Sequence, residues 1–178
     1  IYWSPVSGAA RYWIYRSTDN KNFDWYDGTN NTSYTNGSTN MGTTYYYKVK
    51  AVNDEGTTSD FSVSKGIRRK PAAPSVSIYR SSGKPQLKWK AVTGASKYWI
   101  YRSTDGVNYK YYDCTTKTSY TNGSVTVGTT YYYKVKAVAV VNGSNVVSAY
   151  SGAKSLKAST AAPSVKITTS SGKPKLSW

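Results

Sequence analysis

Apolar and polar residues alternate along several short segments of the chain, and turn residues separate these segments. The longest is Thr130–Val140, in which Tyr131, Tyr133 and Val135 fall on one face and two lysines fall on the other. A period of two is typical of a β-strand with one buried face. Because a lysine ammonium group is not buried without a partner, the face that carries Tyr131 is predicted to point into a core.

Turn sequences divide residues 73–158 into about seven segments of this kind. The turns include "SSGKP", "TGAS" and the pair Asp105-Gly106, whose composition suits a tight hairpin. The predicted strands are Ser75–Arg80, Gln86–Lys90, Lys97–Arg102, Val107–Tyr112, Thr118–Thr121, Thr130–Val140 and Val146–Leu156. No segment has the 3.6-residue period of a helix. The sequence therefore predicts an all-β fold, an antiparallel β-sandwich of the immunoglobulin-like kind.

The pattern occurs more than once. Arg11–Phe23 ("RYWIYRSTDNKNF") returns 86 residues later as Lys97–Tyr109, and Ala73–Trp89 ("APSVSIYRSSGKPQLKW") returns 89 residues later as Ala162–Trp178 ("APSVKITTSSGKPKLSW"). A repeat of this size indicates tandem copies of one domain. The predicted domains are 1–70, which lacks its first strand and part of its second, 71–160, which is complete, and 161–178, the first strand and start of the second strand of a further repeat.

The repeat aligns Trp3, Trp89 and Trp178 at one position. Residues 161–178 therefore contain the elements that the first copy lacks. Two accounts fit this arrangement. In one, the chain is a window in a longer continuous array of repeats. In the other, Ala162–Trp178 completes the first copy of a second chain, which would give head-to-tail growth into a fibre.

The chain is strongly basic, with 24 lysine and arginine residues against eight carboxylates and a net charge of +16. Such a surface favours polyanions: nucleic acid, an anionic membrane or an anionic cell-wall polymer. The sequence contains no recognised nucleic-acid motif and no apolar run of membrane-spanning length. We therefore expect neither specific nucleic-acid binding nor a membrane span.

Residues with catalytic chemistry are scarce. The chain has no histidine, so its single cysteine, Cys114, has no histidine to act as its base. Asp54, Glu55 and Asp60 share one loop of the first copy, but the corresponding loop of the second copy has no carboxylate. No phosphate-binding loop, zinc pattern or dinucleotide fingerprint is present. We expect no cofactor and no metal, and we predict that the chain is not an enzyme.

Several motifs resemble those of fibronectin type III domains, in the form common in secreted and surface proteins of Gram-positive bacteria. These motifs are "LKW", "KYWIYRS", "GTTYYYKVKAV" and the opening "APSV". The resemblance implies a secreted or cell-surface location. It also implies structural core roles, the inter-sheet tryptophan for Trp3 and Trp89 and the tyrosine corner for Tyr45 and Tyr131.

A second set of aromatic residues is predicted to face outward. Tyr98 and Ile100 alternate with Trp99 and Tyr101, so burial of the first pair exposes the second. In the family this strand neighbours the one that carries the lysines, which would bring aromatic rings and cations together. Such a surface can bind sugar rings or anionic groups, or can simply stabilise the sheet. The candidate ligand surface comprises Trp13, Tyr15, Tyr46, Lys48, Lys50, Trp99, Tyr101, Arg102, Tyr132, Lys134 and Lys136.

These observations predict a non-catalytic tandem β-sandwich segment of a bacterial extracellular or cell-surface protein. It would act as a spacer or adhesive module, and anionic or polysaccharide cell-wall polymers are its possible partners. Two alternatives remain open. The chain is a fibre subunit that assembles through Ala162–Trp178, or it is an accessory module of a larger secreted carbohydrate- or wall-degrading enzyme.

Overall fold

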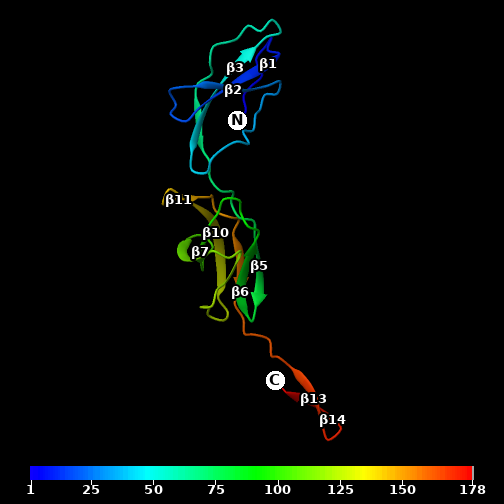
Figure 1. Ribbon diagram of the computed structural model, residues 1–178. Coiled ribbons are helices and arrows are strands. Elements are labelled where there is room, and N and C mark those ends of the chain that lie inside the picture. Colours follow the sequence, from blue (N-terminus) through cyan, green and yellow to red (C-terminus); the bar gives the residue numbers. More distant parts are fainter. Residues whose placement is uncertain (178) are drawn as a thin grey trace. The chain divides into compact units, whose positions relative to one another are not determined.

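A computed structural model describes residues 1–177 of the chain. Trp178, which the repeat aligns with Trp3 and Trp89, lies outside the described residues. The chain divides into two compact units (Figure 1). Unit 1 is Ile1–Lys70, and unit 2 begins at Pro71. Every strand in the described part of the chain pairs antiparallel with its neighbours.

Unit 2 contains two sheets and a separate hairpin. The first sheet has the order β5-β6-β9, formed by β5 (Val76–Ser81), β6 (Lys84–Trp89) and β9 (Ser119–Thr121). The second has the order β11-β10-β7-β8, with β12 also paired to β10; its strands are β7 (Lys97–Ser103), β8 (Lys110–Thr115), β10 (Thr130–Val141), β11 (Ser144–Val147) and β12 (Lys154–Lys157). The hairpin consists of β13 (Lys166–Ser170) and β14 (Lys173–Ser177).

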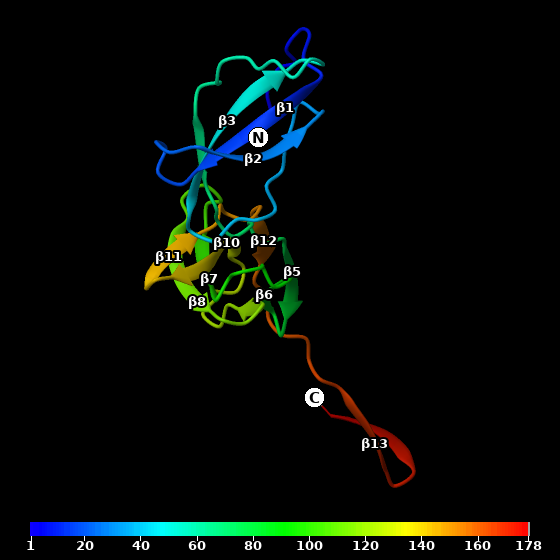
Figure 2. The ribbon, with the colours of Figure 1, turned by 45° about the horizontal axis from the view of Figure 1, so that its top comes forward.

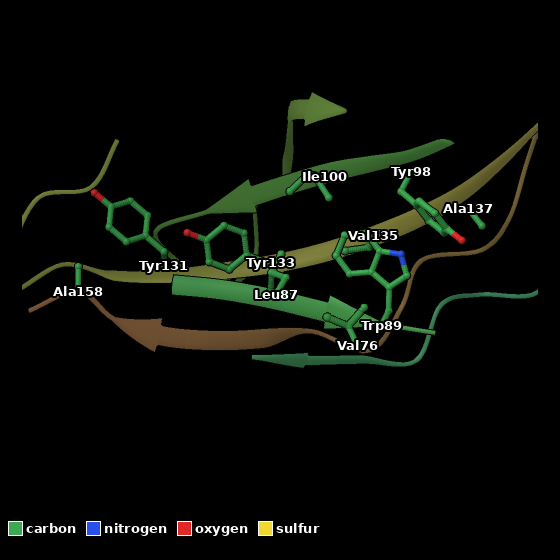
Figure 3. Close-up of a cluster of buried hydrophobic side chains, with 10 residues drawn as sticks. All are labelled: Val76, Leu87, Trp89, Tyr98, Ile100, Tyr131, Tyr133, Val135, Ala137 and Ala158. Carbon is green, nitrogen blue, oxygen red and sulfur yellow. The ribbon is translucent and has the colours of Figure 1, made fainter. Parts of the chain in front are cut away.

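The core of unit 2 lies between its two sheets (Figure 3). Leu87 and Trp89 of β6 meet Ile100 of β7 and Tyr133 and Val135 of β10, all of them buried. These residues alternate with exposed or half-buried ones along each strand, as the period-two pattern predicts. The expected fold class, an all-β antiparallel sandwich, is confirmed.

Unit 1 contains one sheet, with the order β2-β1-β3-β4; Figure 2 shows β1 between β2 and β3. Its strands are β1 (Arg11–Ser17), β2 (Asp24–Thr29), β3 (Thr44–Val52) and β4 (Lys65–Arg68). Its core cluster contains three buried residues, Ile14, Tyr45 and Tyr47, with Trp3 and Tyr34 packed against it. Within residues 1–70, no strand corresponds to β5, which in unit 2 helps to cover the same face.

Two predicted strands of unit 2 are wrong in detail. Val107–Tyr112 is observed as β8, which begins only at Lys110, because the Asp105 carboxylate holds the backbone of the preceding turn as far as Asn108. The predicted strand Val146–Leu156 is broken into β11 and β12. Between them, two serine side chains take the place of main-chain groups in pairing with β10.

Candidate ligand surface

Lysines and aromatic rings alternate on the outer face of unit 2. Lys134 Nζ lies 4.1 Å from the ring centre of Tyr109 and 5.6 Å from that of Tyr150. Lys136 Nζ lies 3.9 Å from the ring centre of Tyr150 and 5.6 Å from that of Tyr101. Both lysines are thus placed for cation–π contact with two rings. We call this row, Tyr109–Lys134–Tyr150–Lys136–Tyr101, the cation–aromatic ladder.

Unit 1 has the same ladder at the equivalent positions. Lys48 Nζ lies 4.4 Å from the ring centre of Phe23 and 5.5 Å from that of Phe61, and Lys50 Nζ lies 4.4 Å from the Phe61 ring. Tyr15 meets Phe61 edge-on, with 4.7 Å between the ring centres, as Tyr101 meets Tyr150 at 4.9 Å. The arrangement is therefore a property of the repeat and not of one copy.

Paired serines hold the ladder's outermost ring in unit 2. The Ser148 amide donates to the carbonyl of Ala137, and the Ala137 amide donates back to Ser148 Oγ, both at 2.9 Å. Ser151 exchanges the same two bonds with Val135, at 2.8 and 2.9 Å. Each hydroxyl oxygen replaces a strand carbonyl, so the pairing with β10 continues while the intervening Tyr150 projects beside the lysines.

Unit 1 repeats this support. Ser59 exchanges two bonds with Ala51, and Ser62 exchanges two with Val49, at 2.9 to 3.0 Å. Phe61 lies between these serines, as Tyr150 does between theirs. In both copies the motif Ser-x-aromatic-Ser therefore fixes an aromatic side chain next to two lysines.

The predicted tryptophans and tyrosines of this surface are half-buried. Trp99 and Tyr101 each meet Tyr111 of β8 edge-on, with ring centres 6.2 and 5.9 Å apart. Trp13 of unit 1 lies beside Gly28 on β2. The structure thus brings these aromatic residues to the sheet surface, where neighbouring strands cover part of each ring.

Tyr46 and Tyr132 lie over glycines. Tyr46 is paired with Gly66 across β3 and β4, and its ring occupies the space that a side chain at Gly66 would need. The Tyr132 ring lies against Gly106 in the turn before β8. Both rings are therefore packed within their own unit.

Arg102 does not join this face. Residues alternate along β7, so Arg102 shares the inner face with Ile100. Its guanidinium carbon lies 3.8 Å from the ring centre of Tyr112 and 5.1 Å from that of the buried Tyr131. It also donates to the Ser124 carbonyl at 3.2 Å. Arg102 closes one end of the core, as Arg16 does in unit 1 beside Tyr26 and Tyr45.

The four residues expected to have structural roles lie in or beside the cores. The amides of Asn40 and Thr126 donate to the hydroxyl oxygens of Tyr45 and Tyr131, each at 2.9 Å. Both tyrosines therefore tie a loop to the start of a long strand. Trp3 and Trp89 pack edge-on against Tyr12 and Tyr98, with ring centres 5.3 and 5.1 Å apart.

A buried asparagine joins the loop after β9 to the core. Asn122 is fully buried; its side-chain amide donates to Tyr133 Oη at 2.7 Å, and its side-chain oxygen accepts from Tyr112 Oη at 3.1 Å. Burial raises the pKa of the Tyr133 hydroxyl to about 12, so this hydroxyl stays neutral at physiological pH. Asn36 makes the same contacts to Tyr47 and Tyr26 in unit 1.

Asp105 organises the turn between β7 and β8. Its carboxylate accepts a hydrogen bond from Ser103 Oγ and further bonds from the amides of Val107 and Asn108. These bonds, that of Ser103 foremost, hold the pKa of the Asp105 carboxyl well below its usual value of 3.8. The charged form is therefore the one that the folded turn stabilises.

This preference predicts a pH dependence for the turn. Because the folded pKa lies below the unfolded one, the stabilisation is complete above about pH 3.8 and is lost as pH falls below that value. We expect Asp105→Asn to reduce hydrogen-exchange protection of the peptide spanning residues 103–109 at neutral pH. The difference from the unmodified chain should shrink as pH is lowered through 4. Asp54→Asn, in an exposed loop, is the matched control, and a difference that persists unchanged at low pH would contradict the interpretation.

Sequence reasoning missed the outer rings of the ladder, Phe23 and Tyr109 before β2 and β8, and Phe61 and Tyr150 between the serines. Alternation could not place them, because Tyr109 and Tyr150 fall in the parts of the predicted strands Val107–Tyr112 and Val146–Leu156 that the structure does not form as strand. The repeat could have done so, since an aromatic residue stands at each of these positions in both copies.

Among residues 1–177, no group of three or more histidine, cysteine or carboxylate side chains is placed to hold a metal ion. Cys114 is an exposed free thiol on β8. The described part of the chain also contains no helix with the length and apolarity required to cross a membrane.

Comparison with known proteins yields similarity of structure only. No family model matches the chain, and no curated protein matches it. The chicken interferon gamma receptor alpha chain has a similar solved structure, with a TM-score of 0.58 and 12% identity, covering 89% of this chain and 90% of that one. A two-domain fibronectin type III segment of chicken tenascin has a TM-score of 0.48 and 15% identity, covering 86% of this chain and 87% of that one.

The receptor likeness, at this level of identity, shows the fold alone. That fold is the sandwich implied by the resemblance to fibronectin type III domains: a three-stranded sheet, β5-β6-β9, that packs against the sheet containing β7 and β10.

Proposed function

We propose that this chain is a non-catalytic, extracellular β-sandwich module that binds an anionic cell-wall polymer of a bacterial surface through its cation–aromatic ladders. The observation that carries the proposal is the repetition of the ladder, with two lysines per unit held beside aromatic rings. A bacterial setting is supported by the sequence resemblance alone. The module would serve either as a spacer within a surface protein or beside a catalytic domain.

The geometry favours an anionic ligand over a neutral sugar. A neutral sugar ring binds an aromatic side chain mainly by stacking on its face, but lysines already lie beside the Tyr109 and Tyr150 rings. An ammonium group has three N–H donors, and each ladder lysine of unit 2 has one ring centre at about 4 Å and the second at 5.6 Å. The remaining donors of Lys134 and Lys136 can bind phosphate or carboxylate oxygens. The rings also restrict the lysine side chains, which lowers the entropy lost on binding.

The charge of the whole chain supports the same conclusion. Residues 71–160 contain 12 basic and two acidic residues, so this part of unit 2 attracts polyanions by its net charge. Long-range attraction of this kind is screened by salt, whereas short contacts at a defined site are screened less. Binding at the ladder should therefore persist at salt concentrations that remove non-specific adsorption.

The test measures retention of the full chain on glycerol-phosphate teichoic acid and on a neutral glucan at moderate salt. We expect retention on teichoic acid only. Glutamine at the ladder lysines should weaken the affinity by at least about tenfold. These lysines are Lys48, Lys50, Lys134 and Lys136.

The matched control removes the same charge elsewhere. It carries glutamine at four exposed lysines outside the ladders: Lys21, Lys65, Lys117 and Lys154. An equal loss in the two variants would mean that net charge alone acts, and the ladder would not be the site. If the unmodified chain is not retained on teichoic acid at all, the binding role fails and a spacer role remains.

A further inference from the structure

The β13–β14 hairpin, with Val165 directly before it, exposes apolar side chains whose equivalents in unit 2 are covered. Val165 is 59% exposed and Leu176 is 56% exposed, whereas their sequence equivalents Val76 and Leu87 are 7% and 0% exposed. Ile167 of β13 is also exposed and lies opposite Leu176 in the hairpin. The hairpin therefore presents an apolar face with no cover among the described residues.

Unit 1 exposes the complementary surface. Ile67 of β4 is 65% exposed, although it lies opposite the buried Tyr45 and so on the core side of the sheet. Its equivalent in unit 2, Leu156, is half-buried. Val49 is half-buried where its equivalent Val135 has no exposed surface. We call the part of this side around Ile67 and Val49 the open face; Ile14, Tyr45 and Tyr47 on the same side are buried.

Unit 2 shows how the two surfaces fit. There the β5–β6 hairpin, which has the same turn and the same apolar positions as β13–β14, covers the face that corresponds to the open face (Figure 3). The fit at its turn is close: Gly83 leaves no room for a side chain beside the backbone of Ser159. The hairpin repeats this glycine as Gly172, also with a positive φ, of 72°.

We propose that the β13–β14 hairpin of one copy of this chain docks on the open face of unit 1 in a second copy. The partner is a second copy because the β5–β6 hairpin supplies an internal template for this contact. By that template, Leu176 lies opposite Tyr34 and Ser177 opposite Ser33, as Leu87 lies opposite Tyr120 and Lys88 opposite Ser119.

Docking requires one exchange. Ile1–Trp3 now occupies part of the place that β14 would take: the Trp3 amide donates to the Thr32 carbonyl at 3.0 Å, as the Trp89 amide does to that of Thr118. The incoming β14 displaces these residues, and Leu176 and Ser177 take the positions of Ile1 and Tyr2. The hairpin also brings the whole of β13, which buries Ile67, Val165 and Ile167. The net gain in binding free energy comes from this burial of apolar surface, which contributes about 25 cal/mol per Å².

Disulfide trapping tests this contact directly. In unit 2, Lys88 and Ser119 are cross-strand partners, and the flanking bonds, such as that from the Trp89 amide to Thr118, make them a non-hydrogen-bonded pair. Such a pair has Cα atoms about 4.5 Å apart, within the range of a disulfide. One chain of residues 1–178 therefore carries Ser33→Cys and a second carries Ser177→Cys, both with Cys114→Ser, and the two are mixed under mild oxidation.

We expect a cross-linked heterodimer. Leu176→Asp, on the docking face of the hairpin, should reduce its yield by at least about tenfold, whereas Thr168→Asp, on the opposite face, should not. Ser7→Cys in place of Ser33→Cys, in an exposed loop of unit 1, measures random collision. Absence of the heterodimer, a yield equal to that of Ser7→Cys, or an equal loss with both aspartate variants would overturn the proposal. Because the copies are both basic, added salt should increase the yield.

Discussion

Replacing Tyr133 with alanine is expected to destabilise unit 2 by about 4–8 kcal/mol. Tyr133 is 1% exposed at the centre of the core, and removal of a large buried aromatic side chain costs about 3–5 kcal/mol. The change also leaves the Asn122 amide without its acceptor, which adds about 1–3 kcal/mol. A loss of this size approaches the whole stability of many domains.

The measurement is hydrogen exchange of the full chain in increasing urea, followed in peptides from β7 and β10. Tyr133→Phe keeps the ring and should show only the cost of the lost hydroxyl. Tyr132→Ala, one residue earlier on the outer face, is the matched control and should have the smaller effect. A loss as large from Tyr132→Ala would show that the core is not where the structure has it.

Replacing both Ser148 and Ser151 with alanine should give the second-largest effect, about 2–6 kcal/mol. Each hydroxyl oxygen is the acceptor for a buried main-chain amide of β10, that of Ala137 or Val135. Alanine cannot accept a hydrogen bond, and a buried amide without an acceptor costs about 1–3 kcal/mol. The loss should also free Tyr150 from its position beside the lysines.

The same denaturation experiment measures this effect, and the exchange of the amides of residues 135 and 137 reports on it directly. Ser144→Ala, in the exposed hairpin of β11, is the matched control. Unchanged protection of both amides in the double variant would contradict the proposed role of the serines.

The elements that the sequence predicted well are those whose side chains alternate between core and surface. β7 and β10 agree with prediction within one residue at each end, because Ile100, Tyr133 and Val135 are buried between partners that are not. The last strand could not be predicted, because Ser148 and Ser151 pair with β10 through their hydroxyls. A serine hydroxyl that replaces a main-chain carbonyl leaves no alternating pattern of apolar and polar residues in the sequence.

The candidate surface was predictable to a similar degree. Alternation correctly turned Trp99 and Tyr101 away from the core, and the expected neighbour strand brought them opposite Lys136 and Lys134. The same alternation puts Arg102, one residue after Tyr101, on the inner face of the sheet. There Arg102 stacks on Tyr112 of β8, a strand that was predicted to begin three residues too early. The ladder also required the position of Tyr150 beside the lysines, which alternation does not give.

The paired serines have a consequence for protein engineering. The connection from the long strand to the serines is three residues longer in unit 2 than in unit 1, yet both serine pairs bond the equivalent residues of that strand. The extra length extends the hairpin of β10 and β11, which closes with a two-residue turn at Asn142 and Gly143, both with positive φ. The two copies thus differ in the length of this connection without a shift in the strand register beyond it. A foreign peptide epitope inserted between Asn142 and Gly143 would be displayed at a position that the fold tolerates.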